Sequence, residues 1–207
     1  MNKHLQTMKN ALTNYQKTVK AGLAKMEENN RLYKPEEAEK ANAAIMAKLN
    51  DERQRVKDQI AEAQEAGQRE VNAWGKLDGG KITDDAKLLE HGTITPAQFA
   101  ALADRYQGNA TMVDLLLKYA NEHGDNGGGG FEAVWNFTGN GGKKKPHYDT
   151  SGLQTVEAKQ AGINNAAASA FSLADRIGNL DDNRIGTGPE SPFINSALEH
   201  FGENDVF

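Results

Sequence analysis

The chain has 207 residues and a formal net charge of −5, with 38% hydrophobic and 7% aromatic residues and a mean hydropathy of −0.71. So polar a composition favours elongated helices with narrow apolar stripes over one large core. The absence of cysteine excludes disulfides, cysteine-bound metals and a thiol nucleophile. The sequence has neither a long apolar run nor the apolar centre of a signal peptide, so we expect no membrane span and no secretion.

Residues 3–32 have the clearest periodicity. Their apolar side chains follow alternating steps of three and four residues, which is the seam pattern of a coiled coil and predicts a long helix with an interface along one side. The candidate interface residues are Leu5, Met8, Leu12, Tyr15 and Val19.

The same segment is rich in lysine. Residues 1–26 contain five lysines and no acid, namely Lys3, Lys9, Lys17, Lys20 and Lys25. These lysines indicate either a solvated helix face or, as the alternative, a contact with nucleic acid.

A second long helix is predicted for residues 35–76. Pro35 suits the first position of a helix, and the acids Glu36 and Glu37 suit its positive end. Its apolar stripe is thin and rich in alanine, so the helix needs a partner, either the first helix folded back or another copy of the chain. Residues 1–78 are therefore expected to form a long helical hairpin or coiled coil.

Residues 81–124 are expected to form a small three-helix module after a break at Gly79-Gly80. The first helix is predicted to start near Thr83 and to end before Gly92. The other two are predicted over residues 95–107 and 111–123.

Both of these later helices have sequence patterns typical of capped starts. Thr95 and Gln98 form the pattern of a capping box with proline between them, and Ile94 with Phe99 is placed for a hydrophobic staple. Thr111 with Asp114 predicts a second capping box.

Residues 125–150 form a glycine-rich loop around a short aromatic segment. The segment is an apolar patch that could be a strand or a helix, and its interface candidates are Phe131, Trp135 and Phe137. The glycines at 139–142 precede lysines but lack the spacing of a phosphate-binding loop.

Residues 151–207 are expected to form an alanine-rich helix over 152–177 and an extended C-terminal docking tail. Small residues in the helix favour a close approach to another helix. The tail is acidic with an apolar tip, and its interface candidates are Phe193, Phe201 and Phe207.

The residues that could support catalysis have simpler roles. Three Glu-His pairs lie at predicted helix ends, each with glycine within two residues, where histidine stabilises the last carbonyls. The sequence contains neither a His-Glu-x-x-His pattern nor a Gly-x-Ser-x-Gly pattern. We therefore expect no enzymatic activity, no cofactor, no metal and no small-molecule substrate.

Residues 94–99, Ile-Thr-Pro-Ala-Gln-Phe, and residues 112–120, Met-Val-Asp-Leu-Leu-Leu-Lys-Tyr-Ala, follow a predicted pair of long helices. In this layout, residues 1–124 resemble small helical proteins of the head-assembly modules of tailed phages and prophages. The resemblance implies a non-enzymatic virion structural protein or scaffold that is present in many copies. Its partners would be itself and other capsid proteins, in a virion assembled in the host cytoplasm.

One feature departs from the scaffold pattern. Many scaffolds end in a basic helix that binds the coat protein, whereas residues 189–207 contain four acids and no lysine or arginine. This departure counts against a scaffold and leaves a minor capsid or internal head component open. The alternatives of other classes are a nucleic-acid-associated protein that uses the five lysines, and a cytoplasmic helical adaptor.

Overall fold

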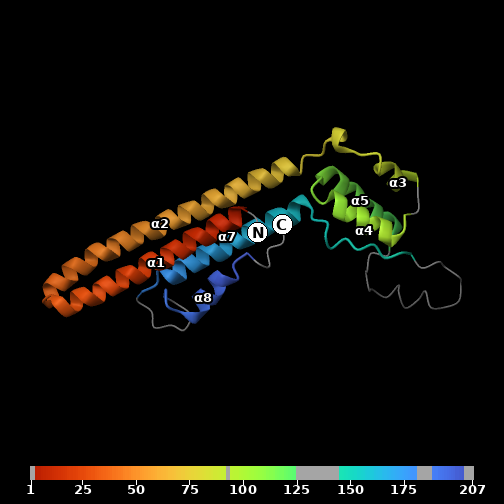
Figure 1. Ribbon diagram of the computed structural model, residues 1–207. Helices are drawn as coiled ribbons and strands as arrows, with labels where there is room; N and C mark the ends of the chain where they lie inside the picture. Colours follow the sequence, from red (N-terminus) through yellow and green to blue (C-terminus); the bar gives the residue numbers. More distant parts are fainter. Residues whose placement is uncertain (1–2, 92–93, 125–144, 181–187, 203–207) are drawn as a thin grey trace. The chain divides into compact units, whose positions relative to one another are not determined.

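The computed structural model describes residues 3–91, 94–124, 145–180 and 188–202 (Figure 1). The chain is mainly helical, as expected, and no strand occurs in these ranges. It forms two compact units, which we call the hairpin unit (residues 1–70 and 160–207) and the small unit (residues 71–159). The predicted segment 131–137 lies outside the described residues.

The hairpin unit is built on two long antiparallel helices, α1 (Lys3–Leu32) and α2 (Pro35–Trp74), which run side by side (Figure 1). Their bounds agree with the predicted helices to within two residues. At the turn, the buried Asn29 side chain donates a hydrogen bond of 3.0 Å to Asn42 of α2. The sequence left open whether the second long helix pairs with the first helix or with another copy of the chain. In this structure, the two helices fold back on each other within one chain.

A third helix, α7 (Val156–Ile177), lies along this pair (Figure 1). Its alanines at 166, 167, 170 and 174 are buried in the same apolar cluster as the stripe of α1. At Gly67 of α2, an added Cβ would lie 2.9 Å from Ile163 Cδ1, so the missing side chain lets α7 approach α2 closely. This is the close helix contact that the small residues predict.

A short helix, α8 (Pro192–Glu199), completes the hairpin unit and is tied to α1 by side chains. Gln16 donates hydrogen bonds to the Pro189 carbonyl at 2.8 Å and to Asn195 at 2.7 Å, and Lys9 donates to the Glu199 carbonyl at 2.7 Å. The predicted division kept residues 151–207 apart from residues 1–78, whereas the structure joins most of both segments in one unit. The reason is that α7 and α8 cover the apolar stripe of α1.

Between the ends of α2 and α7, the described residues of the small unit form a 3-10 turn, η1 (Gly79–Lys81), and three α-helices. These are α3 (Ala86–His91), α4 (Pro96–Tyr106) and α5 (Ala110–His123). The predicted capping box at α4 is confirmed: Thr95 accepts from Gln98 N at 3.3 Å, and the Gln98 side chain accepts from Thr95 N at 2.8 Å.

The predicted cap of α5 is wrong. The helix starts one residue early, and its cap is Asn109, whose side chain accepts from Met112 N at 3.3 Å. The Thr111 hydroxyl instead accepts a hydrogen bond of 3.0 Å from Asp78 N, in the loop before α3. The side chain predicted to cap α5 is therefore used in a contact with this loop. Asn and Thr are both good caps, and sequence alone does not separate them.

Three aromatic rings form the centre of the small unit. Tyr148 lies 4.9 Å from Phe99 and 5.5 Å from Tyr119, measured between ring centroids. The two tyrosines also hold the backbone of Ile94, because Tyr148 donates to its carbonyl at 2.9 Å and Tyr119 accepts from its N–H at 3.0 Å. Burial is the main cause that raises the pKa of Tyr148 to about 12, with a further contribution from Tyr119.

Candidate protein-interaction site

An exposed aromatic side chain marks a groove between α7 and α8. Phe193, in the first turn of α8, is 52% exposed, and the Arg176 guanidinium of α7 lies 4.8 Å from the centroid of its ring. Arginine over an aromatic face is an attractive arrangement. We call this hollow of about 590 Å³ the α7–α8 groove, and its main lining residues are Ala168, Leu173, Arg176, Phe193, Ala197 and Phe201.

Phe193 is exposed because of its position on an anchored helix. Its neighbour Ile194 is fully buried, and Leu198, one turn further on, is 6% exposed, so this face of α8 packs into the core. Phe201 follows the helix and is buried in the same cluster. Since the hydrogen bonds from α1 also hold α8 in place, Phe193 is presented to solvent by a fixed scaffold.

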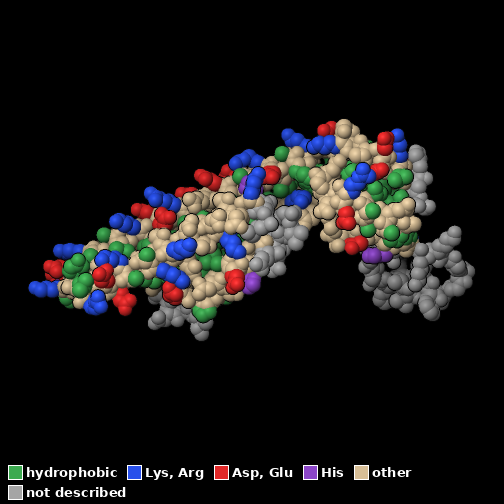
Figure 2. Space-filling view, viewed as in Figure 1, with side chains coloured by type: hydrophobic (Ala, Val, Ile, Leu, Met, Phe, Trp, Pro, Cys, Tyr) green, Lys and Arg blue, Asp and Glu red, His purple; other side chains and the backbone are tan. Residues whose placement is uncertain are grey.

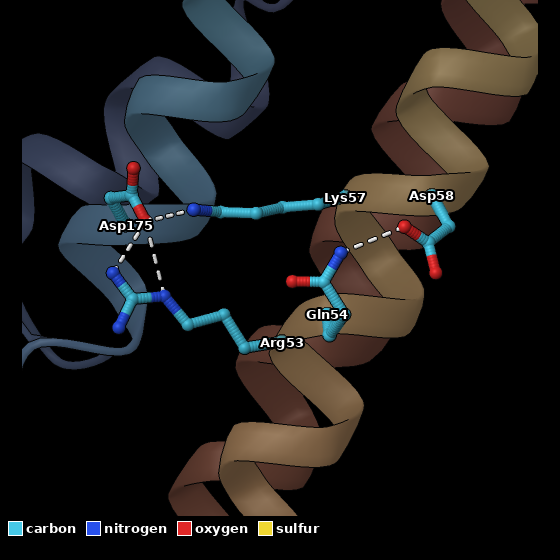
Figure 3. Close-up of polar contacts among 5 residues, drawn as sticks. All are labelled: Arg53, Gln54, Lys57, Asp58 and Asp175. Carbon is cyan, nitrogen blue, oxygen red and sulfur yellow. Dashed lines mark hydrogen bonds and ion pairs between the residues drawn. The ribbon is translucent and has the colours of Figure 1, made fainter.

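A polar edge continues the groove along α7 toward α2. The Arg53 Nε atom lies 3.1 Å from Asp175 Oδ1, the same oxygen is bonded by Arg53 Nη2, and Lys57 Nζ lies 2.7 Å from it (Figure 3). The other pair in that view, Gln54 and Asp58, is bonded along α2 itself.

The charge balance of this polar edge favours anions. Burial alone would raise the pKa of Asp175, but hydrogen bonds from Lys57 and Arg53 outweigh burial and lower it, so the carboxylate stays ionised. Among the described lining residues, Arg53 and Arg176 are cations and Asp175 is a carboxylate, and Lys57 is paired with Asp175 from beside the lining. Positive charge is therefore in excess. Arg176 borders both the apolar groove and the polar edge.

The interface candidates on α1 are buried and do not form an exposed seam. Leu5, Met8, Leu12 and Val19 are fully buried and Tyr15 is 1% exposed, all in one cluster with residues of α2, α7 and α8. Burial raises the pKa of the Tyr15 hydroxyl, with a smaller opposing effect of Arg53. These side chains are core of their own chain in this structure, and they offer no surface to a second molecule.

The aromatic candidates of the C-terminal region fall into two groups. Phe193 and Phe201 both line the α7–α8 groove, one as its exposed part and one as its buried wall. Phe131, Trp135, Phe137 and Phe207 lie outside the described residues. The sequence did not indicate that residues of α7 line the groove. Arg176 in particular was not predicted, since nothing in the local pattern places it beside Phe193.

The five lysines of the alternative interpretation are mostly engaged. Lys3 pairs with Glu70 at 2.7 Å, Lys20 with Glu190 at 3.3 Å and Lys25 with Glu28 at 2.6 Å, while Lys9 donates to a backbone carbonyl and Lys17 is exposed. The hydrogen bond and charge of Lys25 lower the pKa of Glu28, and those of Lys3 and His4 lower the pKa of Glu70. On the face that Figure 2 shows, basic and acidic side chains are interspersed along the hairpin unit.

The histidines that follow glutamates take helix-end positions where these are described. His123 Nδ1 lies 3.2 Å from the Tyr119 carbonyl at the end of α5, and its ring stacks on Tyr119 with a centroid distance of 4.4 Å. His200 is the C-terminal cap residue of α8. Among the described residues, no three His, Asp or Glu side chains are grouped to hold a metal ion.

Comparisons with protein-family models, with curated proteins and with solved structures find no match for this chain. None of the described helices combines the length and the apolar character needed to cross a membrane.

Proposed function

We propose that this chain is a non-enzymatic structural or head-assembly protein of a tailed phage, a minor capsid or internal head component or a scaffold, that acts through protein contacts. The observation that carries the protein-contact part is Phe193, an exposed aromatic side chain on an anchored helix beside an arginine. Aromatic residues and arginine are enriched at the centres of protein interfaces.

The shape of the hairpin unit also supports this proposal. Helix α1 has 30 residues and α2 has 40, and at 1.5 Å per residue a helix of 30 residues is about 45 Å long. Such a rod presents a long lateral surface and little enclosed volume, which suits a spacer or contact element. The phage context comes from the resemblance of residues 94–120 and the preceding helix pair to head-module proteins.

The self-association expected from the α1 stripe needs a different surface. Because that stripe is covered within the chain, we assign contacts with other molecules to the α7–α8 groove and its polar edge. This changes the proposed route of assembly from a coiled-coil seam to a docking groove.

Mass spectrometry of purified procapsids and mature heads tests this function. We expect peptides of this chain in one or both particles at many copies per particle, and the Phe193→Ala variant at a clearly lower copy number. Tyr33→Ala is a matched control, since Tyr33 is a similarly exposed aromatic residue at the far end of the hairpin. Absence of the wild-type chain from both particles would contradict the proposal.

A further inference from the structure

Among the described residues, no third helix covers the part of the hairpin nearest its turn. Helix α7 ends at Ile177, and at the next residue, Gly178, an added Cβ would lie 3.1 Å from the Arg53 Cδ atom of α2. Residues 35–52 of α2 therefore extend past the end of α7 toward the turn (Figure 1). At 1.5 Å per residue, this stretch is about 27 Å long.

One face of α2 borders two hollows along this stretch. The first has a volume of about 640 Å³ and lies near the turn, and the second has a volume of about 720 Å³ and lies at the end of α7. Met46 is half-buried and lines both of them. We call the residues of α2 that line these hollows on either side of Met46 the α2 strip: Glu39, Asn42, Ala43, Met46, Asn50 and Arg53.

The α2 strip is self-complementary about Met46. Glu39 lies seven residues before Met46, and Arg53 lies seven residues after it. Residues seven apart lie on one side of a helix, with a drift of about 20° per seven residues. If two copies of α2 lie antiparallel with their Met46 side chains opposite each other, Glu39 of each copy faces Arg53 of the other. By the same rule Asn42 faces Asn50, and amides can pair as donor and acceptor.

The net charge of α2 has the same symmetry over a longer stretch. Residues 35–45 contain three acids and one lysine, a net charge of −2, whereas residues 47–57 contain four cations and two acids, a net charge of +2. Antiparallel copies place each acidic half beside a basic half, whereas parallel copies place like charges together. Because the strip complements itself, its charge pattern favours a second copy of this chain as the partner.

We propose that the α2 strip binds the α2 strip of a second copy across a two-fold axis at Met46, with Glu39 of each copy on Arg53 of the other. Arg53 has donors for this second carboxylate, because its contact with Asp175 uses Nε and Nη2 of a guanidinium group with five N–H donors (Figure 3). The contact goes beyond the proposed function and closes at two copies. Neither Phe193 nor Tyr33 belongs to the strip.

Cysteine crosslinking locates the axis, since the chain contains no cysteine of its own. Met46→Cys is expected to form a disulfide-linked dimer under mild oxidation, because positions on a two-fold axis bring their Cα atoms within the roughly 4.4–6.8 Å that a disulfide requires. Lys48→Cys is the matched control, since Lys48 is exposed and lies about 200° around α2 from Met46. We expect it to crosslink at least tenfold more slowly.

Sedimentation velocity of the full chain tests the charge pairs. Wild type is expected to dimerise as concentration rises, and more weakly at high salt because charges take part. Glu39→Arg is expected to weaken dimerisation at least tenfold, because it places two arginines opposite each other. Glu37→Arg is the matched control, since Glu37 is exposed and lies on the other side of α2 from Met46.

A mixture of two variants separates a direct contact from an effect on folding. Arg53→Glu alone is also expected to weaken dimerisation, but an equimolar mixture of Arg53→Glu and Glu39→Arg is expected to form a mixed dimer, since both of its pairs again join opposite charges. Circular dichroism shows whether each variant keeps its helix content. If Arg53→Glu does not fold, Glu39→Arg against Glu37→Arg and the crosslinking at position 46 decide the question.

Two results would overturn the proposal. One is a monomer at all concentrations, even where position 46 crosslinks to another head protein, because the partner would then not be a second copy. The other is a dimer that Glu39→Arg weakens no more than Glu37→Arg does, or that crosslinks as fast at position 48 as at position 46. Either result can occur while the chain is still found in phage heads, so it would not by itself refute the proposed function.

Discussion

Replacing Leu12 by alanine tests whether the apolar stripe of α1 is core of its own chain. Leu12 is fully buried in the cluster that joins α1, α2, α7 and α8. The change removes three carbons at about 0.8 kcal/mol each, a loss of about 2.4 kcal/mol. A residual cavity of roughly 40 Å³ adds about 1 kcal/mol, so we expect the free energy of unfolding to fall by about 3 kcal/mol.

Urea unfolding followed by circular dichroism measures this change, with Leu32→Ala as the control. Leu32 ends the same helix but is 59% exposed, so its replacement is expected to alter the free energy of unfolding by no more than about 0.5 kcal/mol. A loss below about 1 kcal/mol for Leu12→Ala, or equal losses for both variants, would refute the intramolecular packing of α1 and restore the intermolecular seam.

Two further predictions concern single polar contacts. Tyr148→Phe removes the hydrogen bond to the buried Ile94 carbonyl and is expected to lower the free energy of unfolding by about 1–3 kcal/mol. Thermal unfolding measures this change. A melting temperature equal to that of wild type would contradict a stabilising role of this hydrogen bond. The lowered pKa of Asp175 means that its ionised form stabilises the fold above its ordinary pKa, which is 3.8, and that this contribution is lost as pH falls through the lowered value. The difference in unfolding free energy between wild type and Asp175→Asn should therefore be constant near neutral pH and shrink below pH 3.8; a difference that grows on acidification would contradict the ion pairs with Arg53 and Lys57.

The long helices and the start of α4 were predictable because their determinants are local. Period and proline position set the bounds of α1 and α2, and Thr95 with Gln98 completes its hydrogen bonds within four residues. The cap of α5 shows the limit of such local information. Asn109 caps the helix because the other candidate, Thr111, accepts a hydrogen bond from Asp78, 33 residues away in sequence.

The pairing of α1 with α7 was not predictable for a related reason. A stripe of leucine and valine can pack on any narrow alanine-rich face, so the sequence permits another copy of the chain as readily as a helix more than 120 residues further on. The ion pairs of Arg53 and Lys57 with Asp175 have the same long-range origin. For the candidate site, the sequence indicated Phe193 and Phe201 but not the arginine that completes the groove.

We propose that the α7–α8 groove contacts other proteins during head assembly. Site-specific photo-crosslinking tests it most directly, with a photoreactive phenylalanine analogue at position 193 in cells that assemble phage heads, and at position 33 as the control. We expect crosslinks from position 193 to a head protein or a second copy of this chain, and far fewer from position 33. Equal labelling from both positions, or no crosslinked product from position 193 in assembled heads, would contradict it.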